Sequence, residues 1–240
     1  IVMRLVGSEM CIRDRILSHE RLSAALPSIL YILKRTKKLC VITHLGRPKE
    51  GEFDIDLSVL PIKKWFEKRL NEEIDLINNF ENIPDNVCFM ENIRFFNGEN
   101  DNDKNLSEQI AKAFDVYVMD AFATAHRAAA STLGAIKFSK NACSGLLFSE
   151  EIKNLESALK ENKQILSIVG GSKISTKLKV IHNLLPNSSA IVVGGGIANT
   201  FLKAAGNPIG KSIVEDDMLD KAKELLSVSY THLRAHETHN

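Results

Sequence analysis

The chain of 240 residues is 44% hydrophobic and 25% charged, a composition that is ordinary for a globular protein and argues against a disordered chain. Lys and Arg number 31 against 30 for Asp and Glu, and the formal net charge of +1 excludes a net field that would attract nucleic acid or a membrane surface. No apolar run approaches the roughly 20 residues of a membrane span, and the four cysteines are far apart in sequence, as expected in a reducing cytoplasm.

Residues 1–15 and 227–240 are interpreted as non-native extensions of the chain. Within them, Leu5–Arg15 and Val228–Thr238 resemble translated sequencing-adapter strings. The C-terminal extension 227–240 carries His232, His236 and His239 at spacings that would share a helix face. We attribute these histidines to the tail rather than to a metal site.

Between the ends, short β-branched runs alternate with longer amphipathic stretches, which is typical of a parallel sheet covered by helices. The expected strands are 39–43, 87–90, 116–119, 165–169 and 190–193. The expected helices are 21–34, 59–70, 105–114, 149–160, 175–185 and 217–226, with Pro27 bending or restarting the first. The pattern predicts an α/β fold with two Rossmann-like parallel-sheet domains of three αβα layers, the second incomplete.

A single amphipathic helix is expected to join two groups of strands. We predict an N-terminal domain over 16–148, a connecting helix and linker over 149–163, and a partial second domain over 164–226. The second domain holds only about sixty residues, which is near the lower limit for an independent core.

Arginines follow three expected strands of the first domain. His44 and Arg47 follow the first strand, Arg94 the second, and His126 and Arg127 the third. Ligands of parallel sheets bind at the carboxyl ends of strands, and three converging guanidinium groups would repel one another unless an anion lay between them. The sequence therefore predicts a site for a small polyanion. Taken alone, each arginine is also compatible with a solvated position, and each histidine with a core position bonded to backbone.

Glycines and lysines follow the two expected strands of the second domain. Gly170-Gly171-Ser172-Lys173 follows one strand, with Lys177 four residues later, and Gly194–Gly196 follows the next. Lysines at the start of a helix are disfavoured unless an anion binds there, although a tight turn with two solvated lysines stays an alternative. The spacing matches neither the Walker P-loop nor the dinucleotide fingerprint.

Two strand–glycine–helix units together with an anion-binding domain suit phosphoryl transfer, whose transition state is stabilised mainly by positioned positive charge. The residues alone indicate a small-molecule kinase. One alternative is a non-catalytic module that binds a phosphorylated acid. A second is a nicotinamide-dependent dehydrogenase, against which the missing dinucleotide fingerprint and the lack of an acidic residue ending the following strand argue.

Six sequence blocks between about Ser18 and Leu226 resemble phosphoglycerate kinase of the bacterial type. The blocks are RLSAALPSI at Arg21, HLGRP at His44, ENIRF at Glu91, DAFATAHRA at Asp120, GGSKISTKL at Gly170 and GGGIANTF at Gly194. The resemblance implies transfer of a phosphoryl group between 1,3-bisphosphoglycerate and ADP to give 3-phosphoglycerate and ATP (EC 2.7.2.3), in two α/β domains that close over a cleft.

The resemblance also implies roles for individual residues. Arg21 matches the arginine that reaches the transferring group, and Lys177 matches a lysine on the nucleotide phosphates, so these two are the expected catalytic residues. The expected acid-binding residues are Arg21, His44, Leu45, Gly46, Arg47, Arg94 and Arg127. The expected nucleotide-binding residues are Gly170, Gly171, Lys173, Lys177, Gly194 and Gly195.

The cofactors implied by the resemblance are ATP or ADP with Mg²⁺. The Mg²⁺ ligands are expected beyond Leu226, so no metal ligand is assigned in this chain. The implied partners are 3-phosphoglycerate and 1,3-bisphosphoglycerate, with no nucleic acid and no membrane, for a cytoplasmic monomer.

The chain departs from the family pattern in several places. The family's first strand, with an aspartate and an asparagine that help to bind the acid, should precede Arg21, where adapter-like sequence stands, so this strand is expected to be missing. Ala123 replaces a glycine, and Ala129 stands where a polar residue is common. The glycine-rich loops and the acidic residue that follow Leu226 in the family are absent, so we expect this chain to be a piece of the enzyme without kinase activity of its own.

Overall fold

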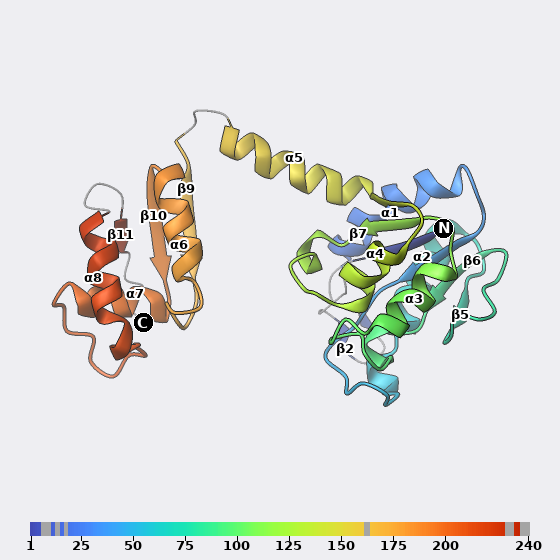
Figure 1. The fold of residues 1–240 in the computed structure, drawn as a ribbon, viewed down its shortest axis with the longest axis horizontal. Helices are drawn as coiled ribbons and strands as arrows, with labels where there is room; N and C mark the ends of the chain where they lie inside the picture. The colour runs from blue at the N-terminus through green and yellow to red at the C-terminus, as the bar shows by residue number, and fades with distance from the viewer. Residues whose placement is uncertain (6–10, 13–14, 17–18, 161–163, 229–232, 236–240) are drawn as a thin grey trace. The chain divides into compact units, whose positions relative to one another are not determined.

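The computed structural model describes residues 1–5, 11–12, 15–16, 19–160, 164–228 and 233–235. By its internal contacts the chain divides into two compact units, Ile1–Lys153 and Asn154–Asn240. The division falls within helix α5 (Leu146–Lys160). Figure 1 shows the helices and strands of both units and labels many of them. The domain organisation predicted from the sequence, with a connecting helix and linker over 149–163, stays a prediction.

The first unit contains a six-stranded parallel sheet. Its strand order is β5-β6-β4-β1-β7-β8. The strands are β1 (Val2–Leu5), β4 (Leu39–Ile42), β5 (Asp75–Ile77), β6 (Val87–Met90), β7 (Tyr117–Asp120) and β8 (Ala142–Ser144). All neighbouring strands are parallel, so their carboxyl ends lie at one edge of the sheet. The α/β fold with a parallel sheet is thereby confirmed.

Strand β1 lies in the middle of this sheet, and the prediction of a missing first strand is wrong. Val2–Leu5 is buried throughout and pairs with β4 on one side and β7 on the other. Its residues alternate between the two faces of the sheet, because Met3 and Leu5 join one core cluster and Val2 the other. The interpretation of residues 1–15 as an extension overlooked this short apolar run.

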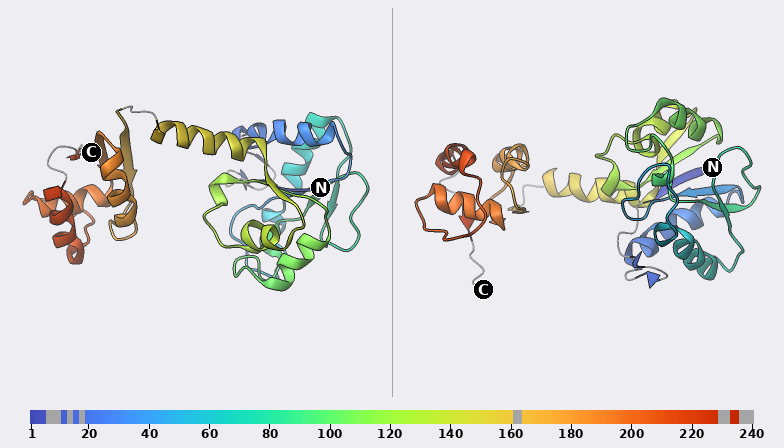
Figure 2. Two further views of the ribbon diagram at one scale, coloured as in Figure 1. Left: turned by 45° about the horizontal axis from the view of Figure 1, so that its top comes forward. Right: turned by 90° about the horizontal axis from the view of Figure 1, so that it is seen from below.

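Helices cover both faces of the first sheet. On one face, α1 (Glu20–Leu33) and α2 (Leu60–Leu70) pack Ile29, Ile62 and Phe66 against the strands. On the other, α3 (Lys104–Lys112), a π-helical turn (Ala130–Gly134) and α4 (Ala135–Phe138) pack Leu106 and Ile110. The right-hand view of Figure 2 shows the blue and teal helices on one side of the strands and the green helices on the other. Three layers result.

The second unit is built on a smaller parallel sheet of order β11-β10-β9. Its strands are β9 (Leu166–Gly170), β10 (Ala190–Gly194) and β11 (Leu233–Ala235). Its helices are α6 (Leu178–Leu184), α7 (Gly196–Ala204) and α8 (Leu219–Val228). One core cluster joins Val169 and Ile191 of the strands to all three helices. Ile168, which points to the other face of the sheet, is 75% exposed.

Parts of the two adapter-like segments are described. Cys11–Ile12 (β2) pairs with Arg15–Ile16 (β3) in an antiparallel ladder, and β11 pairs with β10. His232, His236 and His239 lie outside the described residues.

Candidate functional site

The carboxyl edge of the first sheet carries the basic residues predicted from the sequence. His44 follows β4, Arg94 lies in the 3₁₀ turn Ile93–Phe95 after β6, and Arg127 follows the 3₁₀ turn Phe122–Thr124 after β7. His44 and Arg94 are buried, whereas Arg127 is exposed. The parallel topology therefore brings three segments that are distant in the sequence to a single edge.

The loop after β4 is held by side chains that follow β6. Asn92 is fully buried, and its amide nitrogen donates to the carbonyl oxygens of Leu45 at 2.7 Å and Leu57 at 2.8 Å. Arg94 donates to the carbonyl oxygen of Gly46. Gly46 has φ +60°, and a Cβ there would meet Leu57 Cδ2 at 2.6 Å. The loop therefore requires glycine at this position.

Leu45 and Gly46 thus have a structural part in the loop. The side chain of Leu45 is buried in the core cluster under α1 and α2. Neither residue has a charged side chain, and their carbonyl oxygens accept hydrogen bonds from Asn92 and Arg94. Their assignment to the acid site rests on the sequence resemblance alone and stays a prediction.

Glu91 fixes the start of helix α2 to the end of β6. Its carboxylate accepts from the backbone N–H of Val59 at 2.8 Å and from the hydroxyl of Ser58 at 2.7 Å. The same carboxylate accepts from the backbone N–H of Asn92 at 2.7 Å. A carboxylate suits this place, because the first N–H groups of a helix have no partner within the helix and carry a partial positive charge.

Arg4 of β1 is a buried cation at the same edge. Its Nε donates to Ser131 Oγ at 2.9 Å, and its Nη2 lies 2.8 Å from Nδ1 of His44. Ser131 in turn donates through its backbone N–H at 2.9 Å and through its hydroxyl to the carboxylate of Glu99. Burial raises the pKa of Glu99, while the charge of Arg4 and the bonds from Ser131 oppose that rise.

The electrostatics of His44 show which cations share its surroundings. Burial lowers the pKa of His44 from its ordinary value to about 2. The positive charges that act in the same direction are those of Arg4, Arg94, Arg127 and Arg21. His44 is therefore a neutral imidazole within a cluster of guanidinium groups.

Arg21 and Arg47 complete the set predicted from the sequence. Arg21 lies in the first turn of α1, is exposed, and acts on His44 through its charge. Arg47 is also exposed and follows His44 by three residues in the loop after β4. Long, exposed arginines at the rim of a buried polar network are placed to reach a ligand from solvent.

Two glycine-containing loops meet at the carboxyl edge of the second sheet. Gly170 and Gly194 are register partners at the ends of β9 and β10. Gly195 has φ +67°, and a Cβ on it would meet the carbonyl oxygen of Gly171 at 2.8 Å. The N–H of Ile197 donates to that same oxygen at 3.1 Å. These glycines let the two loops approach closely.

Gly170 and Gly194 differ from their neighbours, because a Cβ on either would meet no described heavy atom within 4 Å. Protein packing therefore gives no reason for glycine at these two positions. Both end strands whose outward face is exposed or half-exposed. The open space beside them suits a flat ligand that approaches the backbone.

The lysines predicted from the sequence lie in a turn before helix α6 rather than within its first turn. Lys177 is the residue that precedes the helix, and its N–H donates to the carbonyl oxygen of Ile174 at 2.9 Å. Lys173 and Lys177 are exposed. The hydroxyl of Ser175 donates to Glu215 at 2.7 Å and its N–H to the same carboxylate at 2.9 Å, which fixes the turn between the lysines.

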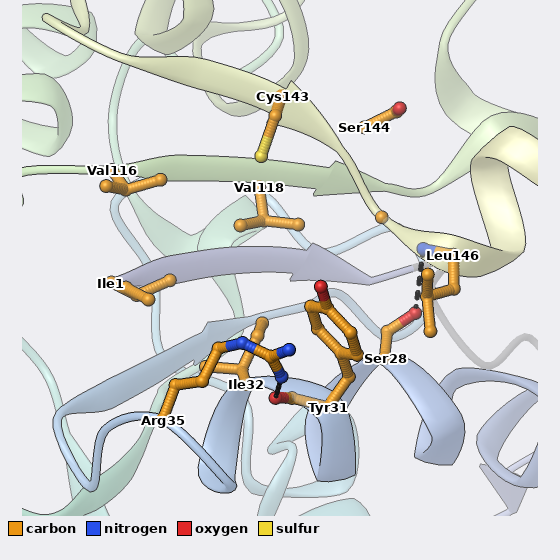
Figure 3. A pocket seen from close by; sticks show the side chains of 11 residues that line it. Ile1, Ser28, Tyr31, Ile32, Arg35, Val116, Val118, Cys143, Ser144 and Leu146 are labelled. Atoms are coloured by element: carbon orange, nitrogen blue, oxygen red, sulfur yellow. Dashed lines mark hydrogen bonds between the residues drawn. The ribbon is translucent and has the colours of Figure 1, made fainter.

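An apolar pocket of about 180 Å³ lies between α1 and the edge of the first sheet. Figure 3 shows Ile1, Val116 and Val118 on the strand side and Tyr31 on the helix side. Its described lining includes none of the predicted site residues. This pocket is therefore separate from the basic edge.

The described residues contain neither a metal-binding cluster nor a helix that could span a membrane. Among residues 1–5, 19–160 and 164–228, no group of three or more His, Cys, Asp or Glu side chains is arranged to hold a metal ion. No described helix combines the length and the apolar character that crossing a membrane requires.

The sequence interpretation missed Arg4, Asn92, Glu99 and Ser131. Arg4 carried a signal, because a lone charge in the apolar run Ile1–Leu5 indicates either a turn or a functional group. Glu99 and Ser131 are 32 residues apart and meet only in the folded chain. No local pattern could have identified that pair.

Comparison with known proteins gives one consistent result. Residues 4–234 match the family model described as phosphoglycerate kinase. The chain is 45% identical over 218 residues to a phosphoglycerate kinase of Francisella philomiragia and 43% identical over 215 residues to that of Coxiella burnetii. These alignments cover 89% and 88% of this chain.

Solved structures agree. The phosphoglycerate kinase structure from Coxiella burnetii has a TM-score of 0.84 at 39% identity and covers 97% of this chain and 62% of its own. The structure from Pyrococcus horikoshii has a TM-score of 0.80 at 25% identity and covers 98% of this chain and 64% of its own. The chain spans about half the length of the curated relatives, 56% and 55% for the two above.

Proposed function

The chain belongs to the phosphoglycerate kinase family, and we propose that the whole protein transfers a phosphoryl group between 1,3-bisphosphoglycerate and ADP in glycolysis. In the direction of ATP synthesis, the bond between phosphorus and the acyl oxygen breaks. A new bond forms between the same phosphorus and a terminal phosphate oxygen of ADP. The carboxylate of 3-phosphoglycerate is the leaving group, so no oxidant or further co-reactant is needed.

The observation that carries this proposal is the basic edge of the first unit. Arg94, Arg127 and Arg21 surround the neutral His44, and Arg47 follows in the same loop. An anion bound among these cations would offset their mutual repulsion, and guanidinium forks match both carboxylate and phosphate. 3-Phosphoglycerate carries both groups on a three-carbon skeleton, which suits an edge of this kind.

We assign the nucleotide to the second unit. Gly170, Gly171, Gly194 and Gly195 would line the space for the nucleotide, since the first and third leave their outward sides open and the others let the loops approach. Lys173 and Lys177 would hold its phosphates from the turn before α6. Mg²⁺ would neutralise phosphate charge during the reaction, and no residue of this chain is assigned to it.

Arg21 and Lys177 are proposed as the catalytic residues. Phosphoryl transfer depends mainly on positioning and on stabilising the charge of the three peripheral oxygens. Arg21 would meet that charge from the acid side and Lys177 from the nucleotide side. We further expect a monomer that works in the cytoplasm.

Binding of 3-phosphoglycerate tests the acid site directly. In the 240-residue chain, Arg47→Ala and Arg127→Ala should each weaken 3-phosphoglycerate binding by about 1.5 to 3 kcal/mol, because each removes one charge-assisted contact. Affinity for ATP should be nearly unchanged, since neither residue belongs to the glycine loops. Isothermal titration calorimetry with both ligands measures the two affinities.

Arg35→Ala is the matched control. Arg35 is an exposed arginine of the same unit, but it lies beside the apolar pocket and donates to the carbonyl oxygen of Tyr31 (Figure 3). This variant should bind 3-phosphoglycerate as the parent chain does. Equal losses for both ligands, or an equal loss in the control, would contradict the assignment of the acid to this edge.

A further inference from the structure

The contact between Arg4 and His44 determines where the imidazole carries its proton. Nη2 of Arg4 lies 2.8 Å from Nδ1 of His44, and both side chains are buried. A guanidinium has only donors. Nδ1 must therefore accept the hydrogen bond, and the proton of the neutral ring must lie on Nε2.

A protonated His44 is incompatible with this contact. Both ring nitrogens would then be donors, and the N–H of Nδ1 would face an N–H of Arg4. Three further positive groups act on the ring: Arg94 from the turn after β6, Arg127 from the loop after β7 and Arg21 from α1. Together with Arg4 they oppose a positive charge on the ring.

Arg4 itself is held in place by three separate contacts. Nε donates to Ser131, which is bonded twice to Glu99, and Nη1 donates to the carbonyl oxygen of Leu5. Nη2 faces His44. The guanidinium cannot turn away from the imidazole without leaving buried donors unpaired, which is costly.

We propose that Arg4 is a positioning residue for the acid site: it holds His44 as the neutral Nε2–H tautomer, which donates one hydrogen bond to a bound phosphorylated carboxylic acid. The identity of the acid rests on the proposed function, whereas the tautomer does not. A neutral donor adds direction beside the cationic donors of the arginines. It does so without increasing the repulsion that the arginines exert on one another when no anion is bound.

Nitrogen NMR of the 240-residue chain tests the tautomer without any activity measurement. Long-range ¹H–¹⁵N spectra at about pH 7 should show His44 with an unprotonated Nδ1 and a protonated Nε2, with His44→Gln used to assign the signals. Arg4→Met should convert this into a mixture of both tautomers. Arg4→Lys should restore part of the original form, because an ammonium can also donate to Nδ1. Arg35→Met should leave the spectrum of His44 unchanged.

The second measurement is 3-phosphoglycerate binding. Addition of the acid should shift the Nε2 signal of His44 in the parent chain. Arg4→Met should weaken binding by roughly tenfold, the loss expected for one directed hydrogen bond to a charged ligand. Arg4→Lys should recover part of that affinity, which a merely structural role for Arg4 would not predict.

The outcomes distinguish the positioning role of Arg4 from the binding of the acid by His44. A parent chain with a protonated Nδ1, or an Arg4→Met variant with an unchanged tautomer, would overturn the positioning role. The fluorescence of Trp65 shows whether Arg4→Met folds. If it does not, Ser131→Ala takes its place: this variant keeps Arg4 but removes the hydrogen bond from its Nε to Ser131, and it should still populate the tautomer with a protonated Nδ1. If the tautomer is as expected but the acid never shifts Nε2, the donor role and the acid assignment fail, while the hold of Arg4 on the ring is upheld.

Discussion

At the scale of the residue, the basic edge depends on buried polar side chains as much as on exposed arginines. Asn92 holds the carbonyl oxygens of Leu45 and Leu57, while Glu91 holds the start of α2. Each is buried with its hydrogen bonds made, which is the condition under which a buried polar group is tolerated. Their substitution would displace the loop that carries His44 and Arg47.

The depressed pKa of His44 predicts a loss of stability in acid. The folded state keeps the ring neutral down to a pKa of about 2, whereas the unfolded chain takes up a proton near the ordinary value of 6.5. Since the unfolded state binds more protons between these values, His44 stabilises the fold above about pH 6.5 and this contribution falls as the pH falls. The loss should reach about 2 kcal/mol at about pH 5.

Urea unfolding at about pH 7 and about pH 5 measures this loss. The chain has one tryptophan, Trp65 in α2, so its fluorescence follows the first unit alone. His44→Gln should remove this part of the pH dependence. His126→Gln, at an exposed histidine of the same edge, should retain it. An identical pH dependence in both variants would show that His44 does not account for the loss.

Arg21 is predicted to act on the transferring group more than on ground-state binding. In the whole protein, Arg21→Ala should lower kcat by orders of magnitude with modest changes in both KM values, the pattern of an interaction made mainly in the transition state. Lys177→Ala should raise the KM for the nucleotide as well as lower kcat, because it meets phosphates both before and during transfer. Steady-state kinetics in a coupled assay distinguishes the patterns, and normal turnover in Arg21→Ala would remove it from the catalytic residues.

At the scale of the element, the two glycine loops of the second unit show two different uses of glycine. A Cβ on Gly196 would meet the carbonyl oxygen of Ser172 at 2.2 Å, and this backbone atom cannot turn aside as a flexible side chain could. A Cβ on Gly170 would meet no described atom within 4 Å. The first glycine serves packing between loops, and the second is free to serve a ligand.

The same substitution at the two glycines should therefore have opposite consequences. Gly196→Ala should destabilise the second unit by about 1 to 3 kcal/mol, the range for overpacking. Gly170→Ala should change its stability by no more than about 0.5 kcal/mol and instead weaken ATP binding. Hydrogen exchange of amides in α6 and α7 measures the stability of this unit. Trp65 fluorescence should be unchanged in both variants, and equal destabilisation would contradict the distinction.

Element boundaries followed from local patterns where periodicity was strong. The predicted helix 59–70 corresponds to Leu60–Leu70, and the predicted strand 87–90 is Val87–Met90. The predicted helix 21–34 is Glu20–Leu33 and continues through Pro27, so the proline does not restart it. The predicted helix 175–185 begins only at Leu178, because Ser175 is bonded to Glu215 outside the helix.

At the scale of the molecule, the second unit has an apolar sheet face that no described helix covers. On β9, Leu166 is 59% exposed and Ile168 is 75% exposed, whereas the next residue, Val169, points to the opposite face and is buried in the core. The second domain was predicted to be incomplete, and a sheet with helices packed on one face fits that prediction. Exposed apolar strand residues favour association between copies of a chain.

This exposed face predicts that the 240-residue chain associates as its concentration rises. Ile168→Thr should reduce association without loss of stability, because it removes exposed apolar area from a strand position that threonine also favours. Ile191→Thr on the neighbouring strand is the contrasting variant, since Ile191 is fully buried and its loss should cost about 2 kcal/mol or more. Sedimentation velocity over a concentration series measures association, and no change in Ile168→Thr would refute the role of this face.

The sequence by itself determined the α/β class, most of the described α-helices, the strands β4, β6, β7, β9 and β10, and the basic and glycine-rich character of the strand ends. These properties depend on local periodicity and on residue type, which a single sequence contains. The family followed from six motifs in a fixed order. The same local approach missed β5 and β8, and it failed at β1 because three apolar residues and one arginine beside an adapter-like segment carry too little periodicity to identify a strand.

Only the tertiary structure decided that β1 lies between β4 and β7, and that Arg4 consequently faces His44. Strand order and the meeting of Arg4, Ser131 and Glu99 depend on contacts between residues 32 to 127 positions apart. Such contacts arise when the sheet assembles and buries its polar groups together, since each must then find its hydrogen-bond partner inside the protein. For that reason the charge state of His44 depends on the folded structure, whereas its position in the motif can be recognised from the sequence.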